Sequence, residues 1–378
     1  MRANGYADFV YDDQNFTLKH PDLGSMFLGN GFHEFSTVPR RHRQTVVEKF
    51  AQVFLSVNGQ EYPDWEVAKP NLRPLVRHED RYGLLRVLDA MEDRKEDSDV
   101  PLPFVGALVG AIALDTENAV HELLRVPEGW DVDREEMWRV AIDNLRYHSS
   151  TPLEAIAPGV YIGSWEDGYE SSRMLIPEIL YRVELEGAPV VMVPGNDAII
   201  LTGDRSEEGL AAMANAVLNV DPQRPLSRCV YRHVDGQWQV WEPDSEYPDL
   251  VDFAQLRVAE IHGSYDEQKH YLDQLYEKRG EDVFVATAMV VENDETGVQT
   301  LCSWGAGVDS ILPQTDLVVI GCVGRERTLV VPWAIALAQL GELMEPVEGL
   351  VPVRFRVRHS PTEDQFEALA TQPGVSAL

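Results

Sequence analysis

The stretch at residues 167–204 constrains the fold more than any other part of the chain, because it joins helical periodicity to two short apolar runs. Leu175 and Ile179 recur at helical spacing, whereas the runs at 190–193 and 198–201 are typical of short buried strands. The tetrapeptide Pro-Gly-Asn-Asp separates these runs and predicts a tight turn that sets their register. We therefore expect a helix and a strand pair at the centre of an N-terminal core.

Helical and strand patterns alternate irregularly along the remainder of the chain, and the two halves share no repeated sequence. This order predicts an α+β fold with mixed, largely antiparallel sheets flanked by helices. Helices are expected at residues 39–54, 133–147, 206–218, 265–279, 332–343 and 361–370, the last two with proline in the first turn, and a short helix is expected at 116–124. Strands are expected at residues 8–19, 25–34, 160–163, 229–234, 237–241, 283–291, 300–304, 317–322, 327–331 and 351–357, and residues 101–115 are expected to form one long strand or a pair of strands.

Local signals place several of these elements. Asp133 and Asp266 are expected helix N-caps, because a carboxylate there accepts hydrogen bonds from free backbone amides. Val47 and Phe50 belong to an apolar stripe that is expected to face a core. The tripeptide Gly-Asn-Gly at residues 29–31 predicts a turn between strands. Asp-Gly at positions 235 and 236 is a strong signal for a two-residue hairpin turn.

The length of 378 residues favours two domains, because single domains usually hold roughly 100 to 200 residues. The proline-bearing segment at 242–248 is the best linker, and it places the boundary near Asp244. We therefore expect an N-terminal α+β domain over 1–243 and a C-terminal α+β domain over 244–378.

The net charge of −31 surrounds the protein with a negative field and limits its partners. Nucleic acid and anionic membranes are disfavoured, because both are bound through basic surfaces. A protein partner is favoured for the same reason, and a basic partner suits the negative field. Three isolated cysteines and an N-terminus without a signal-peptide pattern predict a cytoplasmic protein, and no apolar run approaches the roughly 20 residues of a membrane span.

Several short motifs within residues 1–220 resemble the YtpQ-like proteins, a bacterial family defined as a domain of unknown function. The resemblance implies a shared N-terminal fold unit and leaves activity open, because the family has no established activity to carry over. The motifs are Gly29-Asn30, Arg41 with Arg43, Leu72-Arg73-Pro74 with Arg77, Ala141-Ile142-Asp143-Asn144-Leu145, Tyr169-Glu170-Ser171-Ser172-Arg173 and Val191-Met192-Val193-Pro194.

Arg40, Arg41 and Arg43 form a basic cluster where a helix is expected to begin. Guanidinium groups beside free backbone amides suit a phosphate or the carboxylates of a partner. The same arginines can instead pair with the chain's own surplus of acidic side chains. Arg41 and Arg43 are therefore candidate binding residues, with both interpretations open.

Glu170 and Arg173 flank two serines at the start of the central helix. A nucleophilic serine needs a neighbouring base, and the surrounding sequence lacks the G-x-S-x-G and S-x-x-K patterns. We therefore expect these hydroxyl groups to satisfy backbone amides. Glu170 and Arg173 are candidate residues for contact with a ligand or partner.

His78-Glu79-Asp80 places an imidazole beside carboxylates, which are the ingredients of a metal site or an acid–base pair. Neighbours on a regular strand point to opposite faces, and the spacing of known metal motifs is missing. We therefore expect these side chains to be solvated. Glycine-rich phosphate loops are also missing from the sequence, so no cofactor and no metal site are expected.

Trp304 and Asp309 bracket a Gly-Ala-Gly segment that predicts a structured turn or a recognition loop. Several tryptophans lie around and after the linker. Their rings can belong to a core or, if exposed, anchor an interface. Both residues are therefore candidates for partner binding. Cys302 is expected to be a buried strand cysteine rather than a nucleophile.

Two functional hypotheses follow from these patterns, and neither assigns a catalytic residue. The first is a non-enzymatic cytoplasmic protein that acts by binding a partner protein or a regulatory ligand, because the sequence carries no recognised catalytic motif. The second is a hydrolase or transferase with a dispersed polar site, built from Arg41, Arg43, Glu170 and Arg173.

Overall fold

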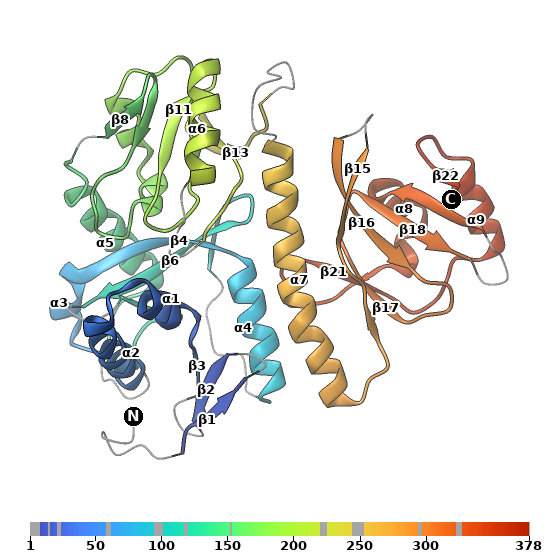
Figure 1. Ribbon diagram of the computed structural model, residues 1–378, viewed down its shortest axis with the longest axis horizontal. Helices are drawn as coiled ribbons and strands as arrows, with labels where there is room; N and C mark the ends of the chain where they lie inside the picture. The colour runs from blue at the N-terminus through green and yellow to red at the C-terminus, as the bar shows by residue number, and fades with distance from the viewer. Residues whose placement is uncertain are drawn as a thin grey trace.

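The computed structural model of the chain is shown in Figure 1. Helices lie against sheets that are mostly antiparallel, so the fold is α+β, as the sequence predicts. The structure describes residues 8–13, 16–20, 24–57, 62–93, 101–116, 120–151, 153–219, 225–243, 253–293, 297–322 and 327–377.

The N-terminal unit combines a small antiparallel sheet with two helices. Its elements are β1 (Val10–Asp12), β2 (Thr17–His20), β3 (Gly24–Phe27), α1 (Gly29–Thr37), the 3-10 helix η2 (Arg40–His42) and α2 (Arg43–Val57). The turn expected at residues 29–31 is wrong, because these residues begin α1. Glycine at position 31 lets α1 approach α2 closely, because a Cβ built there would lie 3.2 Å from the Phe50 ring.

A second sheet forms the start of the main body. Its elements and their neighbours are α3 (Trp65–Ala68), η3 (Lys69–Asn71), β4 (Leu72–His78), α4 (Asp80–Met91), β5 (Leu102–Val105), β6 (Leu108–Asp115), β7 (Val120–Glu122) and α5 (Arg134–Tyr147). The expected N-cap at Asp133 is confirmed, because its Oδ1 accepts from the amide of Glu136 at 2.8 Å. The short helix expected at 116–124 is wrong: β7 pairs with β6 instead. The sequence signalled no element at α4.

Residues 167–204 contribute the strands β10 and β11 to a six-stranded sheet with the order β13-β12-β10-β11-β9-β8. The elements are β8 (Glu154–Ala157), β9 (Val160–Ile162), η4 (Ser171–Leu175), η5 (Pro177–Arg182), β10 (Pro189–Met192), β11 (Ile200–Gly203), α6 (Glu207–Asn219), β12 (Tyr231–Val234) and β13 (Gln237–Val240). The predicted hairpin between β12 and β13 is confirmed, and Asp235 and Gly236 adopt φ values of 52° and 76° in its turn.

One detail of that stretch differs from the prediction. The single helix is replaced by the 3-10 helices η4 and η5, because Ile176 precedes a proline and leaves the helical region with φ −126° and ψ 67°. The strands β10 and β11 pair as expected, with Val191 opposite Leu201. Residues 193–199 connect them, and within this longer loop the amide of Ala198 donates to the carbonyl oxygen of Gly195 at 3.3 Å, so the expected turn is present.

The 27-residue helix α7 (Phe253–Arg279) runs through the middle of the molecule (Figure 1). The expected start at residue 265 and the cap at Asp266 are wrong, because the helix begins earlier and Asp266 lies inside it. One buried cluster joins Leu272 of α7 to Val87 of α4 and to Ile311 of the C-terminal half. The division into two domains stays a prediction, because the proposed boundary residue 244 lies outside the described residues.

The C-terminal half holds two further sheets, with the orders β14-β17-β21-β20 and β15-β16-β18-β19-β22. Two strand pairs, β14 with β17 and β16 with β18, are parallel, so the sheets are mixed as expected. The prolines expected in the first turns of two helices lie just before them: Pro332 is an N-cap, and Thr362 caps the final helix after Pro361. The elements are β14 (Phe284–Val285), β15 (Met289–Asn293), β16 (Gly297–Trp304), β17 (Ser310–Pro313), β18 (Leu317–Gly321), β19 (Thr328–Pro332), α8 (Trp333–Leu340), η6 (Gly341–Leu343), β20 (Glu345–Pro346), β21 (Arg354–Val357), α9 (Glu363–Ala370) and β22 (Ser376–Ala377).

Candidate functional site

Arg173 lies fully buried in the main body and acts as a clamp. Its two terminal nitrogens donate to the two carboxylate oxygens of Asp167 at 2.9 and 2.7 Å, and its Nε donates to Ser149 Oγ at 3.1 Å. The guanidinium carbon sits 4.0 Å from the centre of the Trp165 ring. Burial raises the pKa of Asp167, but the bonds from Arg173 outweigh burial and hold that pKa below its ordinary value. Arg173 therefore holds the loop before η4 in place.

Glu170 lies beside this clamp and is only 2% exposed. Burial raises the pKa of its carboxyl group. Its Oε1 accepts from the amide of Asp167 at 3.3 Å, whereas Oε2 meets no hydrogen-bond partner among the described residues. The structure brings Glu170 and Arg173 together, but both side chains are buried away from solvent.

Trp304 and Asp309 occupy structural positions in the C-terminal half. Trp304 is 1% exposed and belongs to the core beneath α8. Its ring is therefore not available at the surface to anchor an interface. Asp309 pairs with Arg356 through contacts of 3.0 and 2.8 Å, and this bond lowers the pKa of the Asp309 carboxyl group. Cys302 is buried, as expected, and burial raises the pKa of its thiol to about 12.

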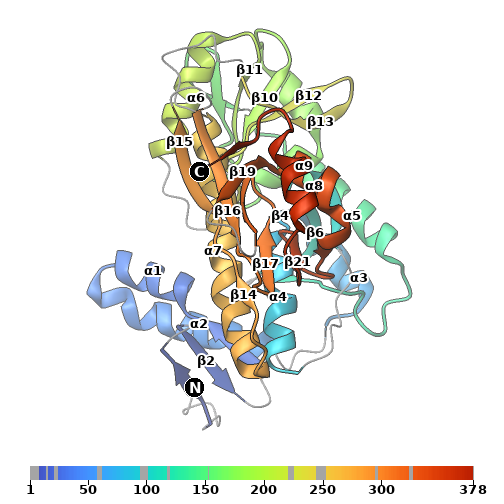
Figure 2. The same cartoon turned by 90° about the vertical axis from the view of Figure 1, so that its right-hand side faces the viewer.

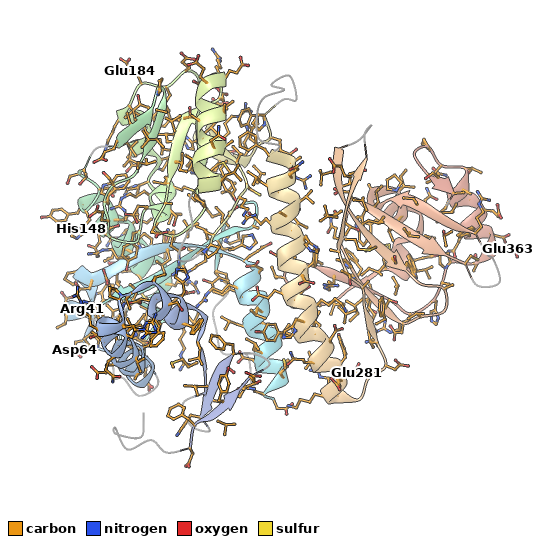
Figure 3. The ribbon with its side chains drawn as sticks, in the orientation of Figure 1. Arg41, Asp64, His148, Glu184, Glu281 and Glu363 are labelled. Carbon is orange, nitrogen blue, oxygen red and sulfur yellow. The ribbon has the colours of Figure 1, made fainter. Side chains whose placement is uncertain are left out.

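The basic cluster at the start of α2 does not pair with the chain's own acids. Among the described residues, no carboxylate lies within ion-pair distance of Arg40, Arg41 or Arg43. Arg41 contacts the neighbouring His42 ring at 2.9 Å, and Figure 3 labels Arg41 at the surface of the N-terminal helices. The self-pairing interpretation is therefore wrong for the described residues, and the guanidinium groups keep their charge available.

An apolar groove of about 390 Å3 lies between the β1–β2 hairpin, α1 and α2. The stripe on α2 lines this groove rather than a sealed core, and Val47 is 49% exposed. Other large side chains in the lining are also open to solvent: Phe32 is 57% and Tyr11 49% exposed. The groove therefore presents a concentrated apolar surface, with a lining formed chiefly by Tyr11, Phe16, Phe32, Phe35, Val47 and Phe50.

A row of aromatic rings leads along the groove to the basic cluster. The rings of Tyr11 and Phe16 are 6.4 Å apart, those of Phe16 and Phe32 are 5.5 Å apart, and those of Phe32 and Phe35 are 6.4 Å apart. The guanidinium carbon of Arg43 lies 4.9 Å from the centre of the Phe35 ring. Within this arrangement Arg43 Nε is shielded from solvent and has no hydrogen-bond partner among the described residues. The groove thus has an apolar floor and a cationic end.

The charge of this part of the chain differs from that of the remainder. Residues 1–60 contain six acidic and six basic residues, so the rest of the chain accounts for the whole net charge of −31. Figure 2 shows α1 and α2 on the opposite side of α7 from α8 and α9. The groove is therefore a neutral region on a strongly acidic protein.

A second cavity, of about 520 Å3, lies beside α7 and is lined by His78, Asp80, Ser227, Glu260 and Glu267 among others. The expectation that His78 is solvated is wrong, because its side chain is only 15% exposed. Nδ1 of His78 lies 2.8 Å from Asp80, and Nε2 lies 3.2 Å from Glu260. Sequence reasoning missed this group, since residue 260 is distant in the chain and carries no local signal.

His78 in this second cavity is already paired with two carboxylates. Burial lowers the pKa of His78, but hydrogen bonds and attraction from Asp80 and Glu260 outweigh it and raise that pKa to about 10. The carboxylate of Glu260 also accepts from Ser227 Oγ at 3.1 Å and from the backbone amide of Arg228. A histidine held as a cation between two carboxylates has no free lone pair to act as a base.

Within the described ranges, no three His, Cys, Asp or Glu side chains converge as a metal-binding group. None of the described helices has both the length and the apolar character needed to cross a membrane. No protein-family description, curated protein or solved structure matches the chain. The resemblance to the YtpQ-like proteins and the hydrolase or transferase hypothesis therefore stay predictions.

Proposed function

We propose that the protein is a non-enzymatic binding protein and that the apolar groove of the N-terminal unit takes an apolar segment of a partner protein. The observation that carries this proposal is the row of aromatic rings ending at arginines that have no acidic partner among the described residues. Contiguous exposed apolar surface with a polar rim is typical of interaction sites. Aromatic residues and arginine are also the commonest hot spots of protein interfaces.

The energetics favour occupation of this groove. Full burial of one large apolar side chain contributes about 1.5–3 kcal/mol, and Phe32 and Val47 both expose about half of their surface in the free protein. The whole-chain charge of −31 supports a protein rather than a nucleic acid as the partner. The isolated cysteines support a reducing compartment, which for this proposal is the cytoplasm.

A photo-crosslinking amino acid placed at Phe32 in the full chain tests the proposal in cells. We expect a crosslink at this position to one partner protein through a segment with apolar side chains. The same group at Tyr147, which is 82% exposed on α5, provides the control and is expected to leave that partner uncrosslinked.

Matched valine substitutions separate groove binding from general surface contact. Val47→Asp introduces a charge into the groove and is expected to abolish the crosslink, whereas Val308→Asp, at a site 43% exposed and remote from the groove, is expected to retain it. Both valines are open to solvent, so each variant is expected to fold. A crosslink that survives Val47→Asp, or equal crosslinking from Tyr147, would overturn the proposed function.

A further inference from the structure

We infer that the occupant of the groove is an amphipathic helix of the partner that carries carboxylate side chains at one end of its apolar face. This inference rests on the proposed function and names the class of partner. It follows from three properties of the groove: its almost wholly apolar lining, the helical spacing of the side chains on its walls, and the Arg43 guanidinium group stacked on the Phe35 ring of its lining.

The apolar lining selects a helix over an extended strand. The lining is almost wholly apolar and offers few hydrogen-bonding groups, so an extended segment would bury amide and carbonyl groups without partners. A helix satisfies its own backbone hydrogen bonds and presents side chains alone. Grooves of this kind bind helices through anchors spaced three, four and seven residues apart.

The geometry of α2 places the charge at one end of the groove. Arg43 and Val47 are four residues apart and therefore lie on the same face of the helix. Arg40 and Arg41 lie in η2, directly before this face. An apolar anchor against Val47 and Phe32 thus puts the next turn of the occupant beside the guanidinium groups.

Carboxylates are the side chains that suit this end. A guanidinium group donates two parallel hydrogen bonds to a carboxylate, and Arg40, Arg41 and Arg43 have no carboxylate of their own among the described residues. The acidic remainder of the chain repels such a partner only weakly, because salt screens charges beyond about 8 Å at physiological ionic strength. The local charge of the groove therefore decides the preference and favours an acidic segment.

Three synthetic peptides with one helical design test the inference against the full chain. Each is about 18 residues long, which allows a stable helix, and carries a fluorophore for anisotropy measurements. The first has an apolar face with glutamates at one end, the second has lysines in their place, and the third keeps the glutamates but has serines in the apolar face. We expect the first to bind about tenfold more tightly than the second, and the third not to bind.

Charge reversal identifies the residues responsible. Arg41→Glu is expected to weaken binding of the glutamate peptide about tenfold and to strengthen binding of the lysine peptide. Arg279→Glu, an exposed arginine on α7, is the matched control and is expected to change both affinities by less than about twofold.

The outcomes separate this inference from the proposed function. Equal binding of the glutamate and lysine peptides, both lost with Val47→Asp, would overturn the acidic preference and retain the groove as a protein-binding site. Palmitate binding that Val47→Asp abolishes, with no peptide bound, would show that the groove takes a small anionic amphiphile and would overturn both.

Discussion

At the scale of single residues, the contact between Arg43 and Phe35 places a positive charge at the end of the apolar groove. A guanidinium group 4.9 Å from an aromatic centroid gains about 0.5–1 kcal/mol at an exposed site. This stacking positions the side chain through its face and leaves N–H donors at its edge for another partner. The structure thereby keeps a cation at the end of an apolar groove without a carboxylate from the part of the chain that it describes.

The side chain of His78, unlike that of Arg43, contacts two carboxylates, those of Asp80 and Glu260. A pKa raised from 6.5 to about 10 in the folded state means that the folded protein keeps a proton that the unfolded chain releases. The resulting stabilisation is complete below about pH 6.5 and is lost progressively as the pH rises through 10. We expect His78→Gln to remove roughly 2–4 kcal/mol of stability near pH 6 and little above pH 10.

Urea unfolding of the wild type and His78→Gln at several pH values between 6 and 10 measures this difference. The gap between their free energies of unfolding is expected to narrow steadily with rising pH. His270→Gln is the control, since His270 is an exposed histidine on α7, and its effect is expected to stay small throughout. A gap for His78 that is constant over the whole range would show that its imidazole is neutral at pH 7.

At the scale of elements, α4 is held by a close approach that only glycine permits. A Cβ built on Gly83 would lie 2.0 Å from the carbonyl oxygen of Val351, so the helix backbone lies directly against the C-terminal half. Alanine normally stabilises a helix interior by about 1 kcal/mol relative to glycine. At Gly83 we expect Gly83→Ala to destabilise the protein by about 1–3 kcal/mol instead, because the methyl group overpacks the contact.

Gly263→Ala provides the matched comparison for that measurement. Gly263 lies inside α7, and a Cβ built there meets no atom within 4 Å. Chemical denaturation is therefore expected to show Gly263→Ala at or above wild-type stability and Gly83→Ala below it. Equal stability of the two variants would mean that α4 does not pack against residue 351 in solution.

At the scale of the whole molecule, α7 connects the buried clusters of both halves. Leu272 is 1% exposed and shares a cluster with Val87 before the helix and Ile311 after it. We expect Leu272→Ala to cost about 2–5 kcal/mol and to lower the hydrogen-exchange protection of both β6 and β18. Loss of protection in β18 alone would instead support two independently unfolding domains.

The control for this experiment is an exposed leucine. Leu218 is 57% exposed near the end of α6, so Leu218→Ala is expected to leave protection in both sheets unchanged. The comparison also tests the boundary expected near residue 244, because a chain divided there would confine the effect of Leu272→Ala to the C-terminal half.

The sequence by itself determined the features that depend on neighbouring residues. The α+β class, the cap at Asp133 and the Asp-Gly hairpin were all predictable, because each follows from local periodicity or from hydrogen bonds a few residues apart. The basic cluster and the apolar stripe on α2 were visible too. Their arrangement as one groove with a cationic end was not, because the hairpin and α1 supply its other walls.

Only the tertiary structure decided the features that depend on distant residues. Contacts between separate segments of the chain explain the start of α7 and the pairing of His78 with Glu260. They also explain why glycine is needed at positions 31 and 83. Packing also separated the candidate residues: burial enclosed Glu170, Arg173 and Trp304, whereas Arg41 stayed at the surface. Burial is a property of the folded chain as a whole, so no local pattern could assign it.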